Sequence, residues 1–353
     1  MKYINTALLL LIIIIITNCK GKPNKTDQPT VIIKPPSGMI WVESKTFLQG
    51  AKGDDKFAMN REKPSHYVTV DGFYIDETEV TNKQFAAFVK ATNYITIAER
   101  PINWDSLKKQ LPPNTPKPHD SILQPGSLVF NKNVNAIVNM ENYGQWWTWM
   151  IGANWKHPYG SESSIEGKDN YPVVHVALED ALEYCKWANR RLPTEAEWEA
   201  AALGKNKNTI YTWGNDSNLL IKSANTWQGT FPTNNESTDG FEFISPVKSY
   251  PPNSIGLYDM IGNVWEITTD LFNMNYYQSL NTSQPLNNPT GPSNSLSSSS
   301  PYQIENVMKG GSFLCHQSYC ASFRISARMG VAQDSGSDHM GFRTVATKDM
   351  LKK

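Results

Sequence analysis

Apolar residues follow a helical pattern only in short stretches of this chain. After Thr81, a good N-cap residue, Phe85, Phe88 and Val89 recur at helical spacing as far as Thr92. This spacing predicts a short amphipathic helix that begins after Thr81.

Two more helices are predicted near the middle of the chain. Thr194 and Glu197 form a capping box in front of the run WEAAAL, and Gly204 follows as a natural C-cap. The segment 178–189 carries one apolar stripe, made of Leu178, Ala181, Leu182, Cys185 and Ala188.

The rest of the chain is rich in Gly, Pro, Asn and aromatic residues, with short β-like runs such as HYVTVDGFYI. This pattern predicts an α+β fold with little regular secondary structure, in which loops dominate a single domain over residues 39–347. Residues 348–353 are expected to be a C-terminal tail. The serine-rich stretch from Asn281 to Pro301 is expected to be a mobile surface excursion.

The N-terminus, MKYINTALLLLIIIIITNCK, has an apolar run from Ala7 to Ile16 after Lys2. The run is too short for a comfortable membrane span but fits a secretory signal. We expect residues 1–19 to be a lipoprotein signal segment ending at Cys19, which would be acylated. The alternative is an ordinary signal peptide with an incidental cysteine, because Thr17 and Asn18 stand where small residues are usual.

Either alternative predicts an exported protein, and the lipid anchor would hold it at a membrane, facing the periplasm or the cell surface. Residues 20–38 are rich in Lys, Pro and Thr and predict a flexible tether. Lys and Arg together number 33, as do Asp and Glu, so charge gives no case for a nucleic-acid partner. No phosphate-binding glycine loop, HExxH pair or GxSxG motif is present.

The chain has four cysteines, and two of them, Cys315 and Cys320, lie five positions apart. In an exported protein a disulfide is the default interpretation. A thiol–disulfide exchange site is less favoured, because such sites usually have two intervening residues. The third alternative is a soft-metal site, since two thiolates suit Cu(I) whereas zinc requires four ligands. His316 and His339 are potential further ligands, but their spacing does not require it.

Several sequence blocks together resemble the formylglycine-generating enzyme family. In chain order they are MIWVESKTFLQG, HYVTVDGFYIDETEVTNKQFAAFV, GANWKHPYG, YPVVHVALEDALEYCKWANRRLPTEAEWEAAALG, YTWGN, GLYDMIGNVWEITTD, KGGSFLCHQSYCASFRISAR and HMGFR. RLPTEAEWE and GN.WE also occur in non-catalytic relatives, whereas GANWKHP and the cysteine block resemble the enzymes. The resemblance implies the family's fold, a relative of the C-type lectin fold, over Met39 to Thr347.

The resemblance also implies an activity. The family oxidises the cysteine of a Cys-X-Pro-X-Arg segment in unfolded sulfatases to Cα-formylglycine, using O2 and an external thiol reductant. Cys315 and Cys320 match its two Cu(I) ligands, and the substrate thiol is thought to be a third. The other matched site residues are Ser312 and Trp265, in the oxygen and substrate pocket, and His316 and Tyr319, which flank the copper ligands.

The family carries two structural Ca2+ sites, which combine carboxylates, amides and carbonyls as calcium requires. The matching positions are Asn225, Thr226, Asp239 and Phe241 for the first site, and Asp259, Gly262, Val264 and Glu266 for the second.

The sequence departs from that of eukaryotic family members at the position that would pair with Cys185. Cys185 matches a disulfide-bonded cysteine of eukaryotic relatives, but Thr344 stands at its partner's position, and Ile325 stands at one site of a second pair. We therefore expect Cys185 to be an unpaired core thiol.

Two other functions compete with the oxidase. One is a non-catalytic surface lipoprotein that uses the fold as a binding or scaffolding module; the cysteine pair argues against it. The other is an iron-dependent sulfoxide synthase, which needs an extra helical module with three histidine ligands. Six scattered histidines give no sign of such a module.

Overall fold

A computed structural model describes residues 35–352 of the 353-residue chain. The predicted signal segment 1–19, its lipidation site Cys19 and most of the predicted tether lie outside the described residues. Residues from Pro35 onward form one compact unit. None of the helices in this described part is both long enough and apolar enough to cross a membrane.

Short strands dominate the regular structure, as the β-like runs in the sequence predict. They form five small sheets rather than one large sheet. The run HYVTVDGFYI supplies two strands that belong to different sheets. The sheets comprise β1 (Met39–Val42), β4 (Phe73–Asp76) and β14 (Val345–Ala346); β2 (Lys45–Gln49), β3 (His66–Val70) and β10 (Leu286–Asn287); β9 (Trp265–Leu271), β11 (Glu305–Lys309), β12 (Met329–Ala332) and β13 (Met340–Gly341); β5 (Gly126–Phe130) and β6 (Trp147–Ile151); and β7 (Gly229–Thr230) and β8 (Asn234–Asn235).

The three predicted helices are confirmed as α1 (Asn82–Thr92), α3 (Leu178–Ala188) and α4 (Glu195–Leu203). Thr194 Oγ1 accepts a hydrogen bond from Glu197 N at 3.1 Å, and Thr194 N donates to Glu197 Oε2 at 2.9 Å, so the capping box is present. The other helical segments are one turn long: α2 (Trp104–Leu107), α5 (Leu220–Ser223), α6 (Tyr276–Ser279), and the 3-10 turns η1 (Asn60–Glu62), η2 (Ile97–Glu99), η3 (Lys108–Gln110), η4 (Tyr143–Gln145) and η5 (Ser217–Leu219).

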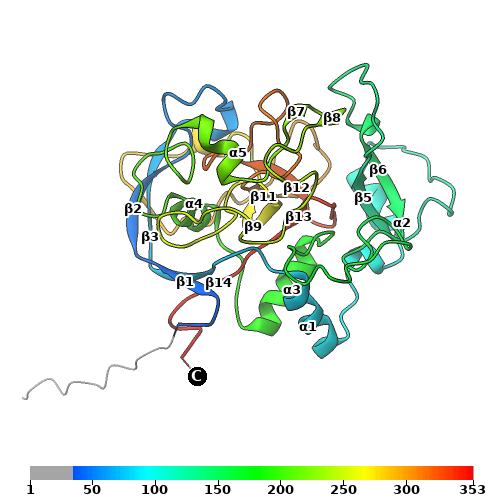
Figure 1. Cartoon of the computed structure of the whole chain (residues 1–353), viewed down its shortest axis with the longest axis horizontal. Helices are drawn as coiled ribbons and strands as arrows, with labels where there is room; N and C mark the ends of the chain where they lie inside the picture. Colours follow the sequence, from blue (N-terminus) through cyan, green and yellow to red (C-terminus); the bar gives the residue numbers. More distant parts are fainter. Residues whose placement is uncertain (1–34, 353) are drawn as a thin grey trace, which may run out of the picture. The chain divides into compact units, whose positions relative to one another are not determined.

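Helix α4 lies at the centre of the core and contacts β2, β3, β9 and β11 (Figure 1). All of its residues but one are buried, so it lacks the polar face of a surface helix. Helix α3 packs against α1 and places Cys185 in the same core. Cys185 is a free, buried thiol as predicted, and Thr344 instead donates its hydroxyl hydrogen bond to Asp76 Oδ2 at 2.6 Å.

The serine-rich stretch between Asn281 and Pro301 lies at the surface as predicted, with most of its residues exposed, but parts of it pair with other segments. Its residues Leu286 and Asn287 form β10, which pairs in parallel with β3. Leu296 exchanges backbone hydrogen bonds with Phe272 and Met274, both at 2.9 Å. The serine-rich composition predicted this exposure but not the pairing, because backbone hydrogen bonds do not depend on side-chain type.

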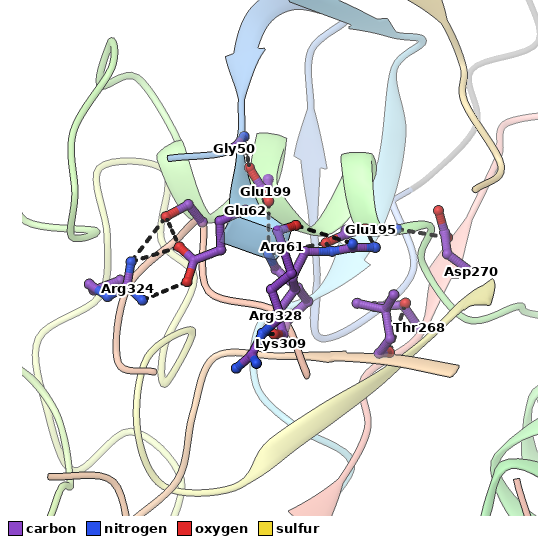
Figure 2. Close-up of polar contacts among 12 residues, drawn as sticks. Gly50, Arg61, Glu62, Glu195, Glu199, Thr268, Asp270, Lys309, Arg324 and Arg328 are labelled. Atoms are coloured by element: carbon purple, nitrogen blue, oxygen red, sulfur yellow. Dashed lines mark hydrogen bonds and ion pairs between the residues drawn. The ribbon is translucent and has the colours of Figure 1, made fainter. Parts of the chain in front are cut away.

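Buried ion pairs connect α4 to the C-terminal strands (Figure 2). Lys309 on β11 donates to Glu199 Oε1 at 2.7 Å, and Arg328 holds both carboxylate oxygens of Glu195, at 2.8 and 2.9 Å. The second oxygen of Glu199 accepts from Gly50 N at 3.2 Å. These side chains are almost completely excluded from solvent, so each charge depends on its partner.

A second buried cluster surrounds Arg324 (Figure 2). Its guanidinium donates to both oxygens of Glu62, at 2.7 and 2.8 Å, and also pairs with Asp55. Arg324 Nε donates to the carbonyl of Ala321 at 2.8 Å. Because Ala321 directly follows Cys320, this cluster attaches the cysteine segment to the N-terminal part of the domain.

We predict that Arg324→Met lowers the free energy of unfolding by about 3–5 kcal/mol, because it leaves two buried carboxylates without their cation. Urea unfolding would measure this change. The matched control is Arg100→Met, which removes an exposed ion pair with Glu179 and should cost no more than about 1 kcal/mol. Equal losses for the two variants would show that the Arg324 cluster does not hold the fold together.

Candidate active site

A tight connection after β11 carries the cysteine pair. Gly310 and Gly311 both have positive φ, +91° and +76°, which glycine adopts without strain. A Cβ on Gly311 would lie 2.9 Å from the carbonyl carbon of Ser322. The chain therefore needs glycine here in order to pass close beside the segment that follows Cys320.

A hydrogen-bonded turn then brings the two cysteines back together. The carbonyl of His316 accepts hydrogen bonds from the backbone N–H groups of Tyr319, Cys320 and Ala321, at 3.0, 3.0 and 3.1 Å. Ser312 N donates to Cys315 Sγ at 3.4 Å. These bonds fix the backbone on both sides of the pair, so the loop is held by its own hydrogen bonds.

Both thiols are buried and neither forms a disulfide. Burial raises the pKa of Cys315 well above its usual value, and the hydrogen bond to Cys320 keeps it protonated. Burial also acts to raise the pKa of Cys320, but the hydrogen bond from Cys315 lowers it below its usual value. The two thiols therefore influence each other's titration, and Cys320 is the more acidic of the two.

The pair lies on the wall of a cleft of about 510 Å3. Of the residues predicted from sequence, Ser312, Trp265 and Tyr319 line this cleft together with Cys315 and Cys320. His316 does not line it: its ring Nδ1 lies 2.8 Å from Ser318 Oγ. His316 contributes to the site through its backbone carbonyl, which closes the turn.

Ser312 is positioned by His339, which sequence reasoning named as a potential ligand. Ser312 Oγ lies 3.1 Å from His339 Nδ1, and the imidazole packs edge-on against Trp147 with ring centroids 4.8 Å apart. Burial lowers the pKa of His339 to about 3, so the ring is neutral at physiological pH. Nδ1 of the neutral ring forms a hydrogen bond with Ser312. The other ring nitrogen, Nε2, makes no hydrogen bond to the described residues.

Aromatic side chains form the remainder of the wall around Tyr319. Its ring stacks on Phe231 with centroids 4.4 Å apart and meets Trp146 edge-on at 5.7 Å. Burial raises the pKa of Tyr319, which therefore keeps its phenolic proton. Such rings exclude water from the side of the cleft that faces the sulfurs.

Sequence reasoning missed several lining residues, among them Arg61, Trp147 and Phe231. Arg61 reaches the cleft from η1, where its Nε donates to the carbonyl of Arg328 at 2.7 Å. Nothing in the local sequence around Arg61 indicates this position, because the contact joins residues 267 positions apart. The adjacent pair Trp146–Trp147 was the one available signal, since two large aromatic residues in a loop-rich region commonly line a pocket.

The donor set fits a soft, low-coordinate metal. The described residues contain no group of three or more His, Cys, Asp or Glu side chains placed to hold a metal ion. Two thiol sulfurs beside an open cleft cannot satisfy zinc, but they match the ligand number and softness that Cu(I) accepts.

The first predicted calcium position brings Asp239 and Asn225 into one neighbourhood. Asp239 accepts backbone hydrogen bonds from Thr226 and Phe241, at 2.9 and 3.1 Å. The side-chain oxygen of Asn225 is buried and has no hydrogen-bond partner. An unpartnered buried oxygen beside a carboxylate fits a cation ligand.

At the second predicted position, carboxylates outnumber cations. Arg343 holds both oxygens of Glu266 at 2.6 Å, so that carboxylate is already neutralised. Burial and the nearby charge of Glu266 help raise the pKa of Asp259 to about 6. Glu79, which sequence reasoning did not name, is also buried here, and one of its carboxylate oxygens has no partner. The excess buried negative charge fits a bound cation, although Glu266 is less available than predicted.

Comparison with known proteins agrees with this fold. The family model of the sulfatase-modifying factor enzyme 1-like domain matches residues 25–348. The formylglycine-generating enzyme of Mycobacterium tuberculosis is 42% identical over 288 residues, covering 81% of this chain and 91% of the relative. That of Mus musculus is 38% identical over 312 residues, covering 87% and 74%.

The chain is also similar to a relative named as inactive and to a solved structure of low sequence identity. The inactive Cα-formylglycine-generating enzyme 2 of Mus musculus is 35% identical over 318 residues, covering 89% of this chain and 87% of the relative. The structure of PvdO from Pseudomonas aeruginosa superposes with a TM-score of 0.58 at 20% identity, covering 87% and 93%, which shows a shared fold only. With the family model matching nearly all of the described residues and curated relatives above 30% identity, the chain belongs to the formylglycine-generating enzyme family.

Proposed function

We propose that this protein is an exported, copper-dependent formylglycine-generating oxidase. It converts the cysteine of a Cys-X-Pro-X-Arg segment in unfolded sulfatases to Cα-formylglycine, with O2 and a thiol reductant. One observation carries the proposal: two buried, unbonded thiols share the wall of an open cleft in a member of this family.

Each cleft residue then has a physical role. Cys315 and Cys320 would hold Cu(I) through their sulfurs, and the metal when bound would supply the redox chemistry with oxygen that side chains lack. Tyr319 and Trp265 exclude water and shape the wall against which the substrate cysteine lies. Ser312, fixed by His339, offers a hydroxyl to the reacting groups.

The competing interpretation is a non-catalytic binding module of the same fold. The inactive relative at 35% identity shows that overall similarity does not decide between the two. The cysteine pair favours the oxidase, because a scaffold has no need of two unbonded thiols in the wall of an open cleft.

We also propose structural Ca2+ at the two predicted positions. Asn225 and Asp239 with the carbonyls of Thr226 and Phe241 would hold one ion. The other ion would use Asp259 and Glu266 with the carbonyls of Gly262 and Val264. The unpartnered oxygen of Asn225 and the excess buried charge near Asp259 support these positions.

For localisation, we propose that acylation of Cys19 anchors the protein to a membrane, with its domain facing the periplasm or cell surface. The apolar run Ala7 to Ile16 directly before this cysteine supports the proposal.

Turnover of a Cys-X-Pro-X-Arg peptide tests the oxidase. The reduced, Cu(I)-loaded protein with O2 and a thiol reductant should convert thiol to aldehyde, measured by mass spectrometry. Cys315→Ser and Cys320→Ser should reduce conversion to background, because oxygen is a poor ligand for Cu(I).

Cys185→Ala is the matched control, since this thiol is buried and does not line the cleft. It should keep full turnover and lose about 1 kcal/mol of stability. Copper-dependent conversion by either serine variant would refute the metal assignment. No conversion by the copper-loaded wild-type protein would favour the binding module.

Calcium binding should raise thermal stability, because a ligand that binds only the folded state shifts the unfolding equilibrium. Adding Ca2+ to chelator-treated protein at a hundredfold excess over Kd should raise Tm by about 5 °C, measured by calorimetry. Asp239→Asn should diminish the shift, whereas Asp54→Asn, on an exposed loop, should keep it. A shift of the same size in both variants would exclude the first calcium position.

Lipidation can be followed by incorporation of a labelled fatty acid in the native host. The wild-type chain should incorporate the label and sediment with membranes, and Cys19→Ala should do neither. A wild-type chain without label would favour an ordinary signal peptide, and label retained in Cys19→Ala would refute Cys19 as the lipidation site.

A further inference from the structure

A second cavity, of about 440 Å3, lies next to the cysteine cleft. Its walls come from η2, α2, the segment 118–123 and β6, and Figure 1 shows α2 beside the β5–β6 hairpin. Ile122 and Trp149 are 55% and 41% exposed, so apolar surface is accessible at this cavity. The large apolar side chains that line it are Ile97, Ile102, Leu107, Ile122, Leu123 and Trp149.

The strand register joins this cavity to the cleft. Leu128 on β5 and Trp149 on β6 are directly paired, and so share one face of the hairpin. Leu128 lines the cleft, whereas Trp149 lines the cavity. Trp147, two residues before Trp149 on the same face, also lines the cleft. One face of the hairpin therefore runs from the cysteine site into the apolar cavity.

One backbone segment forms part of the wall of both the cleft and the cavity. Ser335 and Gly336 line the cleft and the cavity alike. Ser127 Oγ donates to the carbonyl of Gly336 at 2.8 Å, which fixes the segment against β5. A Cβ on Gly336 would lie 2.8 Å from the carbonyl carbon of His175. The backbone of Gly336 therefore packs directly against the backbone of His175.

The hairpin offers a track for extended polypeptide. Sheet β5–β6 has two strands, and the outer edge of β6 has no strand partner among the described residues. Such an edge can form backbone hydrogen bonds with an extended peptide. Trp147 and Trp149 are separated by roughly 7 Å along the strand, which equals two residues of an extended chain.

We propose that the cavity binds a large apolar side chain of the client polypeptide, at a position outside the Cys-X-Pro-X-Arg segment. The proposal rests on the proposed function, because the client cysteine sets where the chain enters. An unfolded client exposes such side chains, whereas a folded one buries them. Binding in the cavity would therefore make the enzyme prefer unfolded chains. This preference would add to its recognition of the Cys-X-Pro-X-Arg segment.

Binding of a peptide series tests the proposal without requiring turnover. Each peptide carries Cys-X-Pro-X-Arg within a Gly, Ser and Lys background, with a single Leu moved one position at a time on either side. Fluorescence anisotropy with the full chain, oxygen excluded, gives Kd. We expect one register at which Leu tightens binding about tenfold, because a buried Leu gains hydrophobic free energy.

Two variants identify the cavity as the binding position. Ile122→Ser removes apolar wall, and Ser106→Trp fills the cavity from α2; both should abolish most of the Leu effect. Ile304→Ser is the matched control, since Ile304 is 59% exposed and lies outside the cavity. All three variants should bind and oxidise the minimal Cys-X-Pro-X-Arg peptide as the wild-type protein does.

The outcomes separate the two hypotheses. A Kd that does not depend on the position of Leu overturns the cavity proposal, as does a Leu effect that Ile122→Ser and Ser106→Trp leave intact. If instead the minimal peptide binds but is not oxidised, the oxidase proposal fails, while a Leu effect lost in both variants would still establish the cavity as a polypeptide site.

Discussion

The buried guanidinium of Arg324 is the interaction on which the active-site geometry depends. It joins Glu62 and Asp55, near the start of the domain, to the carbonyl of Ala321, which follows Cys320. The strands are short and form small sheets, so no extended sheet connects the distant segments of the domain. Buried ion pairs connect these segments instead. A buried pair of this kind tolerates little displacement, because any gap leaves an unsolvated charge.

The two cysteines are also held in place by contacts that allow little displacement. Their loop is closed by hydrogen bonds to a single carbonyl, that of His316, and its entry depends on Gly311 passing close to Ser322. Two sulfurs are therefore held at one wall while the opposite side of the cleft stays open. A site of that form leaves room for a third group from outside, as binding of the proposed peptide thiol would require.

Local patterns predicted some parts of this structure and missed others. The helix at Glu195 was evident from its capping box, and Cys185 from its place on an apolar stripe, because both signals lie within a few residues. Arg61 could not be placed in the cleft, since a contact between distant segments decides its position. The anchoring of the serine-rich stretch through β10 was missed for the same reason: backbone pairing leaves no trace in side-chain composition.

The cleft wall is assembled from segments as distant in sequence as Arg61 and Met340. Contacts of such long range form late, because closing large loops costs chain entropy before packing can compensate. The residues that line the cleft therefore cannot come together in a chain that is only partly synthesised. An oxidase exported as proposed would have to complete its own folding before it could act on another polypeptide that has not yet folded, so the relative speed of the two folding processes would determine which clients are modified.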